Sequence, residues 1–137
     1  NIFIHGRTDD VINIRGHRIG SEEIESIVLR IKEIYECCAI SIVNDLEGHI
    51  IYLFVVSKND KINNLISNKI VSNFGSFALP KEIYYLSELP KTRSGKILRR
   101  LLRDILLNPK GNDYGDLSTI LNSEIVDEIQ YVVSKHE

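Results

Sequence analysis

The sequence has no methionine and no tryptophan, and its two cysteines, Cys37 and Cys38, are adjacent. Because no methionine stands at its start, we interpret the 137 residues as part of a longer protein. Adjacent residues of a strand point to opposite faces, so these thiols do not easily bridge, and they match no metal-ligand spacing. The cysteines therefore predict neither a disulfide nor a metal site, and they favour packed thiols in a reducing, cytoplasmic compartment.

Long hydrophobic runs are missing as well. No run approaches the roughly 20 apolar residues of a membrane-spanning helix, and no signal segment is recognisable. Hydrophobic residues make up 43% of the sequence and charged residues 26%, a balance typical of one soluble domain without a membrane partner. The formal net charge of −2 provides no overall attraction to nucleic acid.

The apolar pattern predicts several strands. Short strands are expected over residues 2–4 and 11–15, around a polar turn, and a tight loop over 16–20. Longer strands are expected over 35–43 and 50–57, with a polar break between them that is typical of a hairpin. A further strand is expected over 82–86.

Helical periodicity appears in four places. Ser21 is a suitable N-cap for the first helix, whose apolar face is expected to carry Ile24, Ile27, Val28, Ile31 and Ile34. Further helices are expected over 59–73, from Ser94 to Leu107, and from Asn122 or Ser123 onward. The order of elements predicts an α+β fold, in which a small β-hairpin precedes a roughly three-stranded sheet flanked by helices.

A basic cluster follows the last expected strand. Six of the seventeen Lys and Arg residues lie within residues 91–103, although the chain is acidic overall. A cation on a glycine-containing loop, backed by an amphipathic helix, suits contact with a phosphate. The same cluster is also typical of a solvated helix face or of a nucleic-acid-binding surface, although the sequence offers no clustered aromatics for base stacking.

Three motifs occur in order along the chain. They are Gly6-Arg7-Thr8-Asp9-Asp10-Val11-Ile12-Asn13, then Gly16-His17-Arg18-Ile19-Gly20 followed by Glu23-Ile24-Glu25, and finally Leu89-Pro90-Lys91-Thr92-Arg93-Ser94-Gly95-Lys96. Together they resemble the C-terminal domain of adenylate-forming enzymes, which include acyl-CoA synthetases, luciferases and peptide-synthetase adenylation domains. The second and third motifs are most similar to those of acetyl- and propionyl-CoA synthetases.

The resemblance implies the C-terminal catalytic lid of an AMP-forming acid–thiol ligase. Such an enzyme uses ATP, Mg²⁺ and coenzyme A: a carboxylate attacks the α-phosphate of ATP to give acyl-adenylate and pyrophosphate, and the thiol of CoA then displaces AMP. Acetate or propionate is the expected acid. The sequence has no phosphate-cradling loop and no acyl pocket, so we expect a missing N-terminal domain as partner and neither activity nor bound cofactors for the fragment alone.

The resemblance also implies roles for particular residues. Lys96 matches the catalytic lysine of the adenylation step, and Asp9 matches the hinge about which the lid rotates. Gly16 matches the glycine that lines the CoA channel after rotation. Arg18 and Arg7 are expected near the phosphate of the nucleotide, His17 is expected to pack rather than to catalyse, and no metal ligand is expected.

One position departs from the family pattern. Acetyl-CoA synthetases carry an arginine upstream of the catalytic lysine that binds the 3′-phosphate of CoA, and ungapped counting from Lys96 places Val71 there. Lys69 is the nearest cation and a candidate substitute. The missing bidentate donor would otherwise weaken recognition of this phosphate.

The resemblance divides the chain into three parts. Residues 1–8 are expected to end the large upstream domain and approach the hinge, residues 9–107 to form the lid, and residues 108–137 to form a C-terminal extension with a final helix. Reversible acetylation of Lys96 by a lysine acyltransferase and a deacylase is also implied. Two alternatives stay open, namely a nucleic-acid-binding module and a stand-alone regulatory domain.

Overall fold

The computed structural model describes residues 11–14, 16–44, 48–111, 114–115, 117 and 120–135. The expected strand over 2–4 and the site predictions for Arg7 and Asp9 lie outside these residues. The elements in order are β1 (Val11–Ile14), β2 (His17–Gly20), α1 (Ser21–Val28), β3 (Ile34–Asn44), β4 (Gly48–Ser57), α2 (Asn63–Phe74), the short 3₁₀ helix η2 (Ser76–Ala78), β5 (Glu82–Tyr85), α3 (Arg99–Leu107) and α4 (Ile125–Ser134). In this described part of the chain, every helix is too short or too polar to cross a bilayer.

The central sheet has the strand order β3-β4-β5. Strands β3 and β4 form the expected antiparallel hairpin, with Cys38 opposite Phe54. Strand β5 runs parallel to β4, and α2 makes the crossover between them. A separate antiparallel ribbon of β1 and β2 precedes the sheet.

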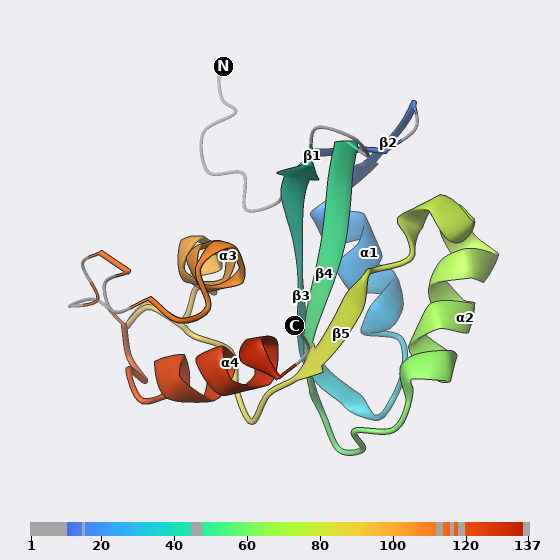
Figure 1. Cartoon of the computed structure of the whole chain (residues 1–137). Coiled ribbons are helices and arrows are strands. Elements are labelled where there is room, and N and C mark those ends of the chain that lie inside the picture. The colour runs from blue at the N-terminus through green and yellow to red at the C-terminus, as the bar shows by residue number, and fades with distance from the viewer. Residues whose placement is uncertain are drawn as a thin grey trace.

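Helices cover both faces of the central sheet. In Figure 1, α1 and α2 lie on one side of the sheet and α3 and α4 on the other. Side chains alternate along β3, so Cys37 and Ala39 face α1 and α2, while Cys38 and Ile40 face α3 and α4. The sheet therefore buries a first apolar cluster against α1 and α2 and a second against α3 and α4, and the predicted α+β fold is confirmed.

The prediction of a loop over 16–20 is wrong, because residues 17–20 form strand β2. Ile12 of β1 pairs with Ile19 of β2, and both side chains are buried within the first cluster. His17 and Arg18 are exposed, so only part of the short strand shows the apolar alternation that sequence analysis detects. The turn at Gly16 has φ +83°, which favours glycine.

All four helix starts differ from expectation, and α4 begins at Ile125 with Glu124, not Asn122 or Ser123, as its N-cap. Helix α1 is capped by Gly20 rather than Ser21, and the Glu23 carboxylate accepts a hydrogen bond from the Gly20 N–H at 2.9 Å. Helix α2 begins at Asn63, because Asn59 turns the chain by accepting the Lys61 N–H at 2.9 Å. Helix α3 begins at Arg99, because the residues before it fold back as a hairpin.

Candidate functional site

The third sequence motif forms a small hairpin between β5 and α3. The Leu98 N–H donates to the Pro90 carbonyl at 2.9 Å, and the Thr92 N–H donates to the Lys96 carbonyl at 2.9 Å. Gly95 turns the chain with φ +93°, and its N–H donates to the Thr92 carbonyl. A Cβ at Gly95 would meet nothing within 4 Å, so the requirement for glycine here is conformational rather than steric.

The hairpin presents Lys96 to solvent. The Thr92 hydroxyl accepts the Lys96 N–H at 3.3 Å and lies 2.9 Å from the Ser94 hydroxyl, so the turn is held by its own polar groups. The Lys96 side chain is exposed, and within the described residues its ammonium group has no hydrogen bond or ion pair. A cation held this way on a polar turn is available to an anionic group that approaches from outside.

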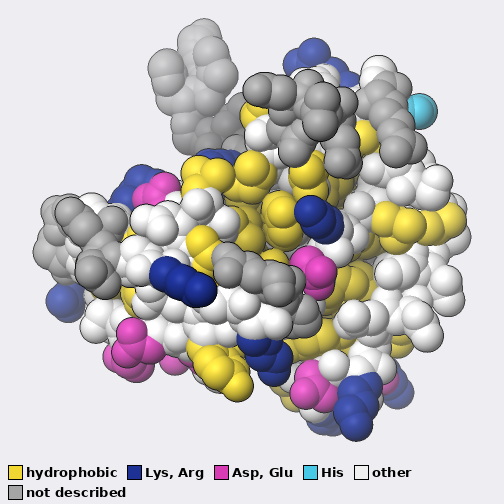
Figure 2. Space-filling model, viewed as in Figure 1, with side chains coloured by type: hydrophobic (Ala, Val, Ile, Leu, Met, Phe, Trp, Pro, Cys, Tyr) yellow, Lys and Arg dark blue, Asp and Glu magenta, His cyan; other side chains and the backbone are white. Residues whose placement is uncertain are grey.

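The other cations of the basic cluster are largely engaged. Lys91 forms an ion pair with Glu36 of β3, and Arg100 forms an ion pair with Asp104 one turn further along α3 at 3.1 Å. Arg99 pairs with Glu25. Figure 2 shows acidic side chains interspersed with basic ones on the face in view, so the basic residues form no continuous positive surface there.

The pair between Arg99 and Glu25 joins the second motif to the helix that follows the third. Arg99 Nη2 donates to both Glu25 carboxylate oxygens, at 2.9 and 2.7 Å, and Arg99 Nη1 donates to the Ala39 carbonyl at 3.1 Å. The same carboxylate accepts the Ala39 N–H at 2.8 Å. Helices α1 and α3 are thereby tied together at β3.

Burial raises the pKa of the Glu25 carboxyl above its ordinary value, although the Ala39 N–H and the Arg99 charge pull it back. Sequence analysis missed this pair, since its members are 74 residues apart. The available signal was an acid at position 25, on the apolar face of α1.

Gly16, predicted for the CoA channel, and Arg18, predicted for the nucleotide phosphate, lie in the other layer of the domain. Gly16 turns the β1–β2 ribbon, and Arg18 of β2 is exposed. The ribbon packs on the cluster under α1 and α2, whereas Ile97 and Leu98, next to Lys96, pack on the cluster under α3 and α4. The structure therefore does not bring Lys96 together with Gly16 and Arg18.

The remaining predicted residues lie near that same layer. His17 stacks on Phe77 with ring centroids 4.0 Å apart, as expected for a packing residue. Lys69 is half-buried on α2, two residues before the exposed Val71. No group of three or more metal-ligating side chains occurs among the residues that the structure describes.

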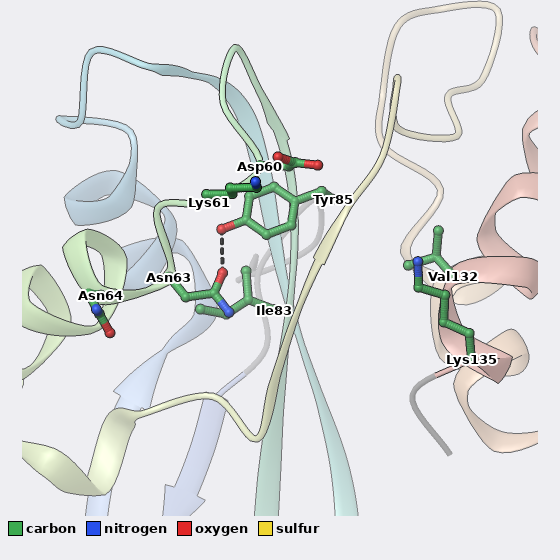
Figure 3. A pocket seen from close by; sticks show the side chains of 8 residues that line it. All are labelled: Asp60, Lys61, Asn63, Asn64, Ile83, Tyr85, Val132 and Lys135. Carbon is green, nitrogen blue, oxygen red and sulfur yellow. Dashed lines mark hydrogen bonds between the residues drawn. The ribbon is translucent and has the colours of Figure 1, made fainter.

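A polar pocket of about 500 Å³ lies away from all three motifs. Figure 3 shows Lys61 and Tyr85 on one side of it and Lys135, the residue after α4, on the other. The Tyr85 hydroxyl hydrogen-bonds to Asn63, and burial raises the pKa of this phenol. This pocket contains none of the predicted site residues.

Comparison with known proteins defines the class of the domain. Residues 23–96 match the AMP-binding enzyme C-terminal domain, and Lys96 is the last matched residue. The chain belongs to this family of AMP-binding enzyme C-terminal domains.

Within this family, the chain is similar to acetyl-coenzyme A synthetases. The chain is 39% identical over 131 residues to an acetyl-coenzyme A synthetase of Penicillium chrysogenum, a match covering 93% of this chain and 19% of that protein. It is 39% identical over 137 residues to acetyl-coenzyme A synthetase 1 of Saccharomyces cerevisiae, covering 91% and 19%. The chain thus spans about a fifth of the length of these relatives.

Solved structures give the same fold. Acetoacetyl-CoA synthetase from Streptomyces lividans superimposes with a TM-score of 0.72 at 22% identity, covering 97% of this chain and 20% of that one. The acyl-CoA synthetase of Brucella canis superimposes with a TM-score of 0.67 at 30% identity, covering 77% and 20%. The expected similarity to acyl-CoA synthetases is confirmed.

Proposed function

We propose that this chain is the catalytic lid of an AMP-forming short-chain acyl-CoA synthetase acting on acetate or propionate. The observation that carries the proposal is the exposed Lys96 ammonium on a glycine-turned hairpin, in a domain of the AMP-binding enzyme family. Relatives named acetyl-coenzyme A synthetase favour acetate. In the intact enzyme, an upstream domain would supply the nucleotide and acyl pockets.

Lys96 acts in the first half-reaction. Attack of the carboxylate on the α-phosphate of ATP builds negative charge on the phosphoryl oxygens, and a cation already positioned there lowers the barrier. The Lys96 ammonium suits binding to an anionic phosphate. Among the described residues it forms no ion pair that would first have to break. Mg²⁺ accompanies ATP and neutralises part of the same charge when it is bound.

The β1–β2 ribbon acts in the second half-reaction. We infer that the lid rotates about Asp9, so that Gly16 lines the path of the CoA thiol and Arg18 and Arg7 approach the nucleotide phosphate. The position of Gly16 and Lys96 in opposite layers supports this division, since one orientation cannot easily present both. Lys69 on α2 is the candidate cation for the CoA 3′-phosphate.

The other parts of the proposal follow from the same assignment. Residues 1–8 belong to the end of the upstream domain, 9–107 to the lid and 108–137 to its extension. Lys96 is exposed, which suits reversible acetylation by a cytoplasmic acyltransferase, and acetylation would remove its charge. Weak nucleic-acid binding stays a prediction, supported by the acidic partners of Lys91, Arg99 and Arg100.

The test is Lys96→Ala in the intact enzyme. We expect acid-dependent ATP–pyrophosphate exchange to fall about 100-fold or more, the size of effect seen when one transition-state donor is removed. Thioester formation from supplied acyl-adenylate should remain near wild type. Lys32→Ala, which removes an exposed lysine outside the three motifs, serves as control and should leave both rates unchanged.

Retained pyrophosphate exchange in Lys96→Ala would contradict the assignment. Equal loss of both half-reactions would also count against it, because a role confined to adenylation predicts damage to one of them alone.

A further inference from the structure

A segment beyond the family match packs against the Lys96 hairpin. The matched residues end at Lys96, whereas the described residues continue to position 135. Ile120 forms an antiparallel bridge with Thr92, and the Leu121 N–H donates to the Lys91 carbonyl at 2.7 Å. The C-terminal extension thus pairs with the first arm of the hairpin through one isolated bridge and one backbone hydrogen bond.

Asn122 completes this contact with its side chain. Its Oδ1 accepts the Lys91 N–H at 3.2 Å, and its Nδ2 donates to the Leu89 carbonyl at 3.1 Å. These two backbone groups flank Pro90, which has no N–H of its own. Asn122 is only 8% exposed, so water does not readily replace the amide if it is removed.

The hairpin is consequently fixed at both ends. Asn122 holds its entry at Leu89 and Lys91, and the ion pair of Arg99 with Glu25 holds its exit. Residues 93–96 between these anchors are exposed. The reach of the Lys96 ammonium is therefore set by two fixed points and a short turn.

We propose that Asn122 is a positioning residue for Lys96, and that the C-terminal extension serves the adenylation half-reaction. The proposal rests on the proposed function, because Lys96 is the group that Asn122 positions. It assigns a role to a segment outside the family match, whose contribution the motifs do not explain.

Attachment of α4 does not depend on Asn122. The helix buries Ile125, Ile129 and Val133 against the second cluster, and Glu128 accepts the Ser87 N–H at 2.8 Å. Gln130 of α4 provides a matched control, since its amide donates to the Pro109 and Gly111 carbonyls at 3.1 and 2.9 Å, away from the hairpin.

The experiment compares Asn122→Ala, Asn122→Asp, Gln130→Ala and Lys96→Ala in the intact enzyme. Amide hydrogen exchange is measured at Thr92, Gly95 and Lys96, whose N–H groups are bonded within the hairpin. Pyrophosphate exchange, thioester formation from supplied acyl-adenylate and melting temperature are measured alongside.

We expect Asn122→Ala to speed hydrogen exchange in the hairpin about tenfold and to slow pyrophosphate exchange by a similar factor, about 1.4 kcal/mol, with thioester formation unchanged. Asn122→Asp keeps the acceptor for the Lys91 N–H and should have a smaller effect. Gln130→Ala should lower the melting temperature without changing the hairpin or either half-reaction.

The proposal is overturned if Asn122→Ala leaves hairpin exchange unchanged, or if Asn122→Ala and Gln130→Ala slow pyrophosphate exchange equally. The proposal is also overturned if Asn122→Ala speeds amide hydrogen exchange in the hairpin but leaves pyrophosphate exchange normal, while Lys96→Ala abolishes pyrophosphate exchange. Normal pyrophosphate exchange in Lys96→Ala would instead reject the proposed function, and the hydrogen-exchange comparison would still decide whether Asn122 holds the hairpin.

Discussion

Cys37 and Cys38 are neighbours in β3 and point into different apolar clusters. Their exposed fractions are 4% and 0%, and the Cys37 thiol lies 3.5 Å from the Glu25 carbonyl oxygen. Burial, with a smaller contribution from the nearby Glu25 carboxylate, raises the pKa of the Cys37 thiol above its ordinary value. At neutral pH this group stays protonated and is a poor nucleophile.

We therefore expect both thiols to be inert in the folded chain. A thiol-specific reagent at neutral pH should modify neither cysteine within the time in which a denatured sample reacts at both. Mass spectrometry of the two samples measures this. Fast modification of Cys37 in the native state would contradict its placement in the core.

For single residues, the sequence predicts which residue types occupy the motifs but not which groups these residues contact. The exposed Lys96 and the positive φ of Gly95 agree with the expectation of a glycine-flexed loop that carries a cation. The roles of Asp9 and Arg7 stay predictions, and so do those of Arg18 and Lys69. Each depends on a surface of another domain that local sequence does not specify.

At the scale of elements, α1, β3 and α3 are joined by the ion pair of Arg99 with Glu25 and by its hydrogen bonds to Ala39. Side chains of Arg99 and Glu25 are 17% and 11% exposed, so the pair is shielded from solvent. Loss of one member of such a pair leaves the other charge buried without compensation, which costs about 3–5 kcal/mol. The exposed pair of Arg100 with Asp104, at 49% and 38%, is expected to contribute about 0.3–0.5 kcal/mol.

A double-mutant cycle tests this difference. Glu25→Ala and Arg99→Ala should each lower the free energy of unfolding by about 3 kcal/mol, and the double variant should cost less than their sum by about 1–3 kcal/mol. Urea unfolding gives these values. The Arg100–Asp104 cycle is the control, and a coupling energy equally small in both cycles would remove the case for a structural joint.

Element type was predictable from the sequence where many residues repeat one pattern. The alternation along β3 and β4 and the periodicity of α1 involve many buried positions, so these elements were found, but α1 ends at Val28 and Ile34, expected on its face, begins β3. The start of α3 was not, because the preceding hairpin depends on contacts with Ile120 and Asn122 further along the chain. Strand β2 was missed because it is four residues long and half exposed.

For the whole molecule, the central feature is the separation of two surfaces by one sheet. The Lys96 hairpin packs with α3 and α4, and the Gly16 turn belongs to the ribbon beside α1 and α2 (Figure 1). A lid that serves two half-reactions in two orientations needs this kind of separation. Under that account, damage to one surface should spare the reaction performed by the other.

Gly16→Leu tests the surface formed by the β1–β2 ribbon. Its φ of +83° strains any replacement, but a Cβ there meets nothing within 4 Å, so Gly16→Ala has the same strain with little added bulk. Leu should block the CoA channel in the thioester-forming orientation. We expect Gly16→Leu to reduce acyl-CoA formation at least tenfold more than Gly16→Ala does, with circular dichroism confirming that both variants are folded.

The most direct test of the two-surface account measures both half-reactions in Lys96→Ala and Gly16→Leu of the same intact enzyme. If the two surfaces act separately, we expect Lys96→Ala to lose pyrophosphate exchange and keep thioester formation from acyl-adenylate, and Gly16→Leu to keep pyrophosphate exchange and lose thioester formation. Parallel loss of both half-reactions in folded samples of both variants would contradict it.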